Sequence, residues 1–164
     1  MTLFDFAVLV VVALSMLLGW WRGLVYEAVS LLTWVAAYFV ARLFAPDLVD
    51  YVPASVGTLS ARMAVAFSAL FALTLAAGGV LAWGMNKLVK SSGLERLDGS
   101  LGTVFGLVRG GFVVLLLVLL GGMTTLPTTP AWRDALMSGA LEEVAVQARG
   151  WLPEALAQKI HFRD

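Results

Sequence analysis

The sequence predicts an all-α, polytopic membrane protein: a bundle of four transmembrane helices followed by a C-terminal amphipathic helix. The first observation is composition, because 60% of the 164 residues are hydrophobic and only 13% are charged. The mean hydropathy is correspondingly high, at +0.90. The second observation is contiguity, because the apolar residues form four long runs, and runs of about 18 or more residues are typical of helices that cross a bilayer.

These runs define a membrane domain over residues 1–126. A helix rises 1.5 Å per residue, so about 20 residues cross a hydrocarbon core of roughly 30 Å. The first run carries Asp5 and no Lys or Arg before its two tryptophans, so we expect a retained anchor rather than a cleaved signal peptide. The predicted spans are residues 3–21, 24–44, 63–89 and 101–123, and the third is long enough to tilt or project.

The tail, residues 127–164, is expected to be amphipathic and to lie outside the cytoplasm. Thr129 is a candidate N-cap, with Pro130 at the first helical position. Apolar residues three or four positions apart form one stripe along the predicted helix. Such a helix could lie at the headgroup boundary of the bilayer or pack against the bundle. The members of the stripe are Trp132, Leu136, Ala140, Val144, Ala148 and Trp151, before Pro153 interrupts the pattern.

Several classes of function find no support in the composition. The 11 basic and 11 acidic residues cancel, so no nucleic-acid partner is predicted. The chain has no cysteine, and its single histidine, His161, lies in the tail, which removes thiol chemistry and a histidine base within the membrane. No phosphate loop, dinucleotide fingerprint or HExxH motif is present. We therefore expect no enzymatic activity, no metal and no cofactor.

One short motif occurs twice, as GWWRG from Gly19 to Gly23 and as GLVRG from Gly106 to Gly110. Glycine permits tight turns or close helix contacts, and arginine near the end of a span can reach the lipid phosphates, so the motif can mark a membrane boundary. That reading suits Arg22 at the tip of the first hairpin. Arg109 lies about two turns inside the fourth run, where a cation is expensive and usually paired.

Two pairs of opposite charges are therefore predicted within the spans. Glu27, one turn into the second run on the same membrane side, is the candidate partner of Arg109. Asp5 and Arg42 would lie at similar depth on the opposite side. Such pairs either fix the register of helices or belong to a functional polar path.

Small residues four positions apart predict close helix packing on the third and fourth spans. Whether these grooves serve the bundle itself or a second copy of the chain stays open. The residues are Gly102, Gly106 and Gly110 on the fourth span and Ala64, Ser68, Ala72 and Ala76 on the third.

The opening FDFAVLVVVALSMLLGWWRGLVYEAVSLLTW, together with GLERLDGSLGTVFGLVRG, resembles the colicin V production protein family, CvpA, over about residues 3–122. The tail segments PAWRDAL and GWLPEAL are similar to the looser C-terminal region of the family. Family members commonly have an Asp followed directly by an Arg before the series of glycines that corresponds here to Gly102, Gly106 and Gly110. Here Asp98 precedes Gly99, so the role of that arginine is in doubt unless Arg96 substitutes for it.

The resemblance implies a four-span inner-membrane protein of bacteria that is required for colicin V production, a process of toxin (bacteriocin) biosynthesis or export, and is linked to envelope homeostasis. No catalytic activity is established for the family. The expected partners are the lipid bilayer, membrane or envelope proteins not identified by the sequence, and a second copy as a homo-oligomer.

Two other classes of function stay open. A small transporter or channel would use Glu27, Arg109 and Asp5 to line a polar path, and four spans are so narrow that a pore would need an oligomer. An intramembrane enzyme would need a nucleophile with a base, and the sequence offers no such pair.

Loop charges predict that both termini face the periplasm. Some relatives that resemble this chain carry a C-terminal serine protease domain outside the cytoplasm, which favours the same orientation. The basic residues expected inside are Arg22, Lys87, Lys90 and Arg96, against Arg42, Arg62 and Arg133 near the outer ends.

Overall fold

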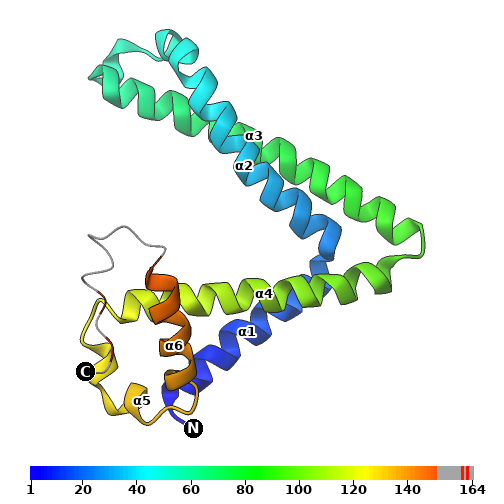
Figure 1. Ribbon diagram of the computed structural model, residues 1–164. Helices are drawn as coiled ribbons and strands as arrows, with labels where there is room; N and C mark the ends of the chain where they lie inside the picture. The colour runs from blue at the N-terminus through cyan, green and yellow to red at the C-terminus, as the bar shows by residue number, and fades with distance from the viewer. Residues whose placement is uncertain (151–159, 161, 163–164) are drawn as a thin grey trace. The chain divides into compact units, whose positions relative to one another are not determined.

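The computed structural model describes residues 1–150, 160 and 162, and the regular secondary structure among them is entirely helical (Figure 1). This confirms the predicted all-α class. The α-helices are α1 (Leu3–Arg22), α2 (Leu24–Leu48), α3 (Leu59–Ser91), α4 (Glu95–Gly121), α5 (Pro130–Arg133) and α6 (Ser138–Arg149). Short 3-10 helices are η1 (Val49–Tyr51), η2 (Ala54–Val56) and η3 (Leu126–Thr128).

Four of the described helices, α1 to α4, are long and apolar enough to cross a membrane, as judged by length and composition. This number agrees with the four predicted runs. The ends differ, because α3 already begins at Leu59 and α4 at Glu95. The predicted ends were placed where the apolar runs end, whereas the hydrogen bonding of a helix can continue through the polar residues beyond them. The hydroxyl oxygen of Thr58, for example, accepts a hydrogen bond from the Ala61 N–H at 3.3 Å and caps α3.

The chain divides into two compact units. The first unit contains Met1–Trp20 and Thr103–Asp164, and the second unit contains Trp21–Gly102. Most of α1 and α4 belong to the first unit, whereas α2 and α3 belong to the second.

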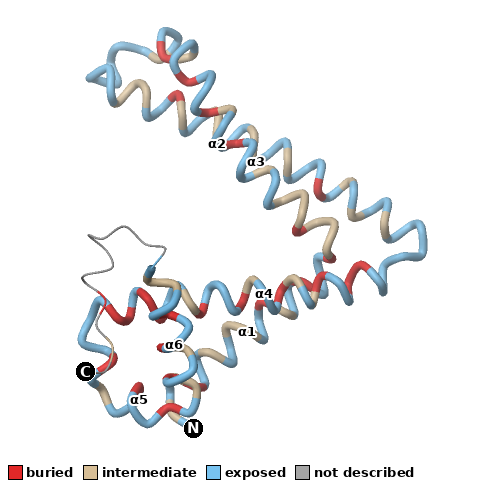
Figure 2. The backbone as a smooth tube through the Cα atoms, in the orientation of Figure 1, coloured by how far each residue is buried: buried red, intermediate tan, exposed pale blue. Residues whose placement is uncertain are grey.

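In the second unit, α2 and α3 pack against each other in antiparallel fashion. Ala37, Ala41 and Ala45 of α2 are buried at intervals of one turn, and such small side chains let helix backbones approach. Aromatic rings also meet across this helix pair: Trp34 contacts Phe71 with ring centroids 5.5 Å apart. The burial of this helix pair is shown in Figure 2.

The segment between α2 and α3 is held by the Arg62 side chain. Its Nε donates to the Val52 carbonyl at 2.9 Å and its Nη2 to the Val49 carbonyl at 2.8 Å. The arginine thus gives the Val52 carbonyl a donor and adds a second donor to the Val49 carbonyl, which also accepts from the Val52 N–H at 3.2 Å. Helix α2 continues past Pro46 to Leu48, beyond the predicted end at residue 44.

The first unit has a hydrophobic core between α1, α4 and the tail. Val114, Val118 and Leu119 of α4 are buried together with Trp132 and Ala145 of the tail. Apolar residues from the first half of α1 pack against this cluster, namely Phe4, Val8, Val11 and Val12. The tail is therefore packed on its own unit, which was one of the two alternatives left open by the sequence.

The tail contains two helices, so the prediction of one continuous apolar stripe was wrong. Asp134–Met137 separate α5 from α6, and a break in the helix changes the direction of every later side chain. Among the predicted members, Trp132 is buried, Leu136, Ala140 and Val144 are exposed, Ala148 is half-buried, and Trp151 lies outside the described residues. From α5 to α6, the buried positions are instead Trp132, Ala135, Ser138, Glu142 and Ala145.

Pro130 is the first residue of α5, as predicted. Thr129 occupies the N-cap position, but its side chain makes no capping bond. Its hydroxyl donates instead to the Leu126 carbonyl at 2.7 Å.

Candidate functional site

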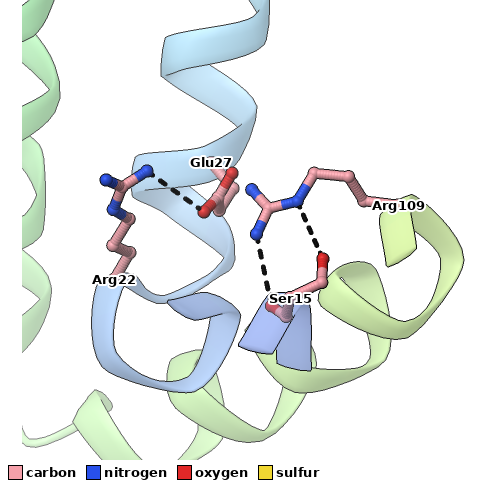
Figure 3. A network of polar contacts seen from close by, with 4 residues as sticks. All are labelled: Ser15, Arg22, Glu27 and Arg109. Atoms are coloured by element: carbon pink, nitrogen blue, oxygen red, sulfur yellow. Dashed lines mark hydrogen bonds and ion pairs between the residues drawn. The ribbon is translucent and has the colours of Figure 1, made fainter. Parts of the chain in front are cut away.

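Charged and polar side chains of the four long helices make contacts within each of the two units. In the second unit, Glu27 meets Arg22 with its Oε1 3.8 Å from the arginine Nη1 (Figure 3). The Glu27 side chain is 7% exposed and that of Arg22 is 48% exposed. The Arg22 guanidinium also lies over the Tyr26 ring, 5.5 Å from its centroid. Glu27 is in the first turn of α2, where the helix dipole stabilises a negative charge.

The start of α2 depends on a contact with Asp98, which the sequence did not single out as a site residue. The Val25 N–H donates to Asp98 Oδ1 at 2.9 Å, and Asp98 is buried. Gly23, at the N-cap position, offers no side-chain bond of its own and has a φ of 80°. Asp98 therefore supplies from the first turn of α4 the carboxylate that an N-cap residue usually provides.

Gly23 is suited to this position for two reasons. A positive φ disfavours residues that have a Cβ, and a Cβ at residue 23 would collide with the Asp98 carboxylate. Arg96, which the sequence proposes as a substitute for the family arginine, lies exposed in the first turn of α4. Its substitution for that arginine stays a prediction.

In the first unit, Arg109 binds α1 (Figure 3). Its Nε donates to the Ser15 hydroxyl oxygen at 3.1 Å, and its Nη2 donates to the Ser15 backbone carbonyl at 3.2 Å. Ser15 is buried, and Arg109 lies near the middle of α4. A guanidinium in an apolar helix thus has an oxygen of the neighbouring helix as acceptor, which reduces the cost of its removal from water.

Gly106 and Gly110 lie on either side of Arg109 in the sequence and allow α1 and α4 to approach each other closely. A Cβ at Gly106 would meet the Ser15 carbonyl oxygen and would lie 2.9 Å from the Met16 Cα. A Cβ at Gly110 would lie 3.1 Å from the Val12 Cα. These glycines therefore face α1 of the same chain. Gly19 and Gly102, also predicted to matter for boundaries and packing, are buried.

The predicted pair between Arg109 and Glu27 joins residues of different units. It stays a prediction, as does the pair between Asp5 and Arg42. Within the second unit, Arg42 is exposed and its Nη1 lies 3.5 Å from the Tyr38 hydroxyl oxygen.

Asp5 fastens the break in the tail to the start of α1. Its carboxylate accepts three backbone hydrogen bonds, from Thr2 at 2.9 Å, Leu136 at 3.2 Å and Met137 at 3.0 Å. Only 1% of Asp5 is exposed. These three N–H donors offset the free-energy cost of burying the carboxylate. Two of them, from Leu136 and Met137, belong to the segment between α5 and α6.

A second buried carboxylate, Glu142, holds the indole of Trp132. The Trp132 Nε1 donates to Glu142 Oε1 at 2.6 Å. The Trp132 ring lies against Phe4 of α1, with centroids 4.5 Å apart, and against Gly121, whose Cβ would come within 2.9 Å of the ring. The sequence analysis placed Trp132 on an apolar stripe and did not foresee its acidic partner.

The four small residues predicted to form a groove on α3 have a different environment. On α3, the side that faces α2 includes Gly78, which lies against Thr33. Residue 78 is two positions after residue 76, the last of the four predicted residues, and two positions correspond to about half a turn of a helix. The groove residues Ala64, Ser68, Ala72 and Ala76 are all exposed.

Within the described part of the chain, no group of three or more His, Cys, Asp or Glu residues is placed to hold a metal ion. The contacts listed above join helices to one another: a carboxylate to helix N–H groups, and a guanidinium to a hydroxyl and a carbonyl. Their geometry serves helix placement.

Comparisons with known proteins identify relatives over most of the chain. The family described as Colicin V production protein matches residues 4–146. A "Colicin V production protein homolog" of Haemophilus influenzae is 34% identical over 132 residues, which cover 80% of each chain. The "Colicin V production protein" of Escherichia coli K12 is 34% identical over 129 residues, which cover 78% of this chain and 79% of the relative. No solved structure matches significantly.

Proposed function

Because the chain belongs to the colicin V production protein family, we propose that it is a multi-pass inner-membrane protein of bacteria that supports colicin V production without catalysing a reaction. In this proposal it acts through protein partners in toxin export and contributes to envelope homeostasis. The observation that carries the proposal is the family match over residues 4–146, a range that covers all four apolar helices except Leu3.

The contacts within each unit support a role without catalysis. Arg109 uses its guanidinium to hold α1 through Ser15, and Asp98 uses its carboxylate to cap α2. These groups are thus occupied in placing helices. A protein that acts through its shape and partners needs such placement.

Complementation tests the proposal. The chain would be expressed in an Escherichia coli strain that lacks its own relative and carries a colicin V plasmid, and secreted toxin would be measured by growth inhibition of a sensitive strain. We expect restored toxin secretion. Normal accumulation of the chain in the membrane fraction without restored secretion would contradict the proposal.

Membrane orientation is a separate part of the proposal, with both termini in the periplasm. Support comes from the basic residues near the inner ends of the predicted spans. Alkaline phosphatase fused after Asp164 should be active, because this reporter folds only outside the cytoplasm. An inactive fusion, with an active cytoplasmic reporter at the same position, would reverse the orientation.

The transporter or channel alternative is tested by water access. The chain has no cysteine, so a single cysteine introduced along α3 or α4 is the only target of a polar thiol reagent. A component that works through partners should label only near the helix ends, whereas a continuous series of labelled positions through α3 or α4 would favour a water-filled path.

A further inference from the structure

Unit one contains an apolar pocket between α1, α4 and the tail. Its volume is about 240 Å³, which exceeds the roughly 150 Å³ of an apolar cavity that holds benzene in an engineered protein. The lining consists of Phe4, Ala7, Val8 and Val11 of α1, Val114, Leu117 and Val118 of α4, Leu126 of η3 and Trp132 of α5. All of these side chains are hydrocarbon apart from the single indole nitrogen of Trp132.

The floor and the rim of this pocket differ in exposure. Val114, Val118 and Trp132 are buried, whereas Ala7 and Leu117 are exposed. Leu126 of η3 is exposed as well. Ala7 and Leu117 belong to α1 and α4, two of the helices that are apolar and long enough to cross a membrane. Hydrocarbon would therefore contact these two rim residues wherever α1 and α4 span a bilayer.

Contacts outside the pocket hold Trp132, one of the floor residues, in place. The Trp132 nitrogen is engaged by the buried Glu142 at 2.6 Å, so the polar atom of the indole already has its acceptor and the ring faces the apolar space. Gly121 leaves room for the ring, and Asp5 ties the segment after α5 to the start of α1. These contacts preform the pocket, which lowers the entropy lost when a ligand binds.

We propose that this pocket binds one acyl chain of a bilayer phospholipid. Water would find no hydrogen-bonding partners in such a lining, and a whole helix of a second protein, about 10 Å across, is too wide for a space of this volume. An acyl chain is narrow, apolar and present beside α1 and α4 wherever they span a bilayer. The inference rests on the membrane location proposed above.

The test uses the full chain reconstituted in vesicles of phosphatidylethanolamine and phosphatidylglycerol, doped with phosphatidylethanolamine that carries a diazirine on one acyl chain. After irradiation, adducts are mapped by proteolysis and mass spectrometry. We expect adducts on the floor residues Val114, Val118 and Trp132. Adducts on exposed positions such as Leu9 report ordinary lipid contact and serve as the internal reference.

Two variants fill the pocket from its rim, Ala7→Phe on α1 and Leu117→Trp on α4. Each should lower the floor adducts about tenfold relative to the reference, which corresponds to about 1.4 kcal/mol of binding free energy. The matched control is Leu9→Phe, because residue 9 is exposed and lies about 200° around α1 from residue 7. Its floor adducts should stay unchanged. Helix content by circular dichroism identifies a variant that fails to fold, and the second variant then decides.

The outcomes separate this inference from the proposed function. Labelled exposed faces with an unlabelled floor, or floor adducts that filling does not reduce, would overturn the acyl-chain site and leave the membrane proposal intact. A reconstituted chain without adducts on any apolar helix would contradict both.

Discussion

Replacing Gly23 by alanine tests the contact that starts α2. Gly23 has φ 80° and ψ 161°, a backbone conformation that is essentially restricted to glycine and costs a residue with a Cβ about 1–3 kcal/mol. The new Cβ would also displace the Asp98 carboxylate, so the Val25 N–H would lose its acceptor. Loss of an N-cap costs about 1 kcal/mol. We therefore expect Gly23→Ala to lower the free energy of unfolding by about 2–4 kcal/mol.

Gly93 provides a control at a glycine that has a positive φ and no close neighbour. Its φ is 79°, and a Cβ there would meet no heavy atom within 4 Å. Gly93→Ala should therefore lose only backbone strain, about 1–2 kcal/mol, and should cost less than Gly23→Ala. A mutant cycle isolates the contribution of the Asp98 cap.

Both variants would be purified in detergent micelles and unfolded reversibly with denaturant, with helix content followed by circular dichroism. A double variant, Gly23→Ala with Asp98→Ala, completes a mutant cycle. Its loss should be smaller than the sum of the single losses, because the alanine at residue 23 has already broken the cap. Equal losses for Gly23→Ala and Gly93→Ala, together with additive losses in the cycle, would refute the reasoning.

Three further predictions concern contacts of the helices and of one loop; the first two use the same unfolding measurement and the third uses limited proteolysis. Gly106→Val should lower stability by about 1–3 kcal/mol through overpacking, whereas Gly111→Val, where a Cβ meets open space, should change it little; equal effects would contradict the α1–α4 packing. Trp132→Phe should cost about 1–3 kcal/mol, because the buried Glu142 carboxylate loses the indole donor, and a neutral result would show that this bond is dispensable. Arg62→Ala should raise proteolysis of the loop between α2 and α3, because the Val52 and Val49 carbonyls lose the arginine donor; unchanged cleavage would argue against that tie.

The number of long apolar helices was predictable because each segment that crosses the hydrocarbon core of a bilayer must meet the same requirements through its own sequence. A span needs about 20 apolar residues and internal backbone hydrogen bonds, and both follow from the local sequence. The exact ends were not predictable in this way. Helix α3 begins at Leu59 with a cap from Thr58, because the helix continues where the apolar run has ended.

The partners of the polar groups could not be read from the sequence. Ser15 and Arg109 are 94 positions apart, and Val25 and Asp98 are 73 apart. Such pairs depend on how far one helix slides along another, and a shift of one residue moves a side chain by 100° around its helix. The buried Asp5 carboxylate of α1 accepts hydrogen bonds from the tail segment between α5 and α6. The helix break in the tail therefore coincides with a contact to a residue far away in sequence, and the spacing of apolar residues within the tail does not reveal it.

The repeated Gly-x-x-Arg-Gly motif shows why one pattern has two physical explanations. In the first copy, Gly23 begins a helix with a positive φ and leaves space for a carboxylate. In the second, Gly106 and Gly110 lie inside α4, where their missing side chains admit α1. Glycine contributes conformational freedom in one place and small size in the other. The arginines differ accordingly: Arg22 is half exposed beside a glutamate, whereas Arg109 donates to oxygens of a neighbouring helix. The surrounding element therefore decides which property of glycine matters, and the same five-residue pattern produces a helix start in one case and a helix contact in the other.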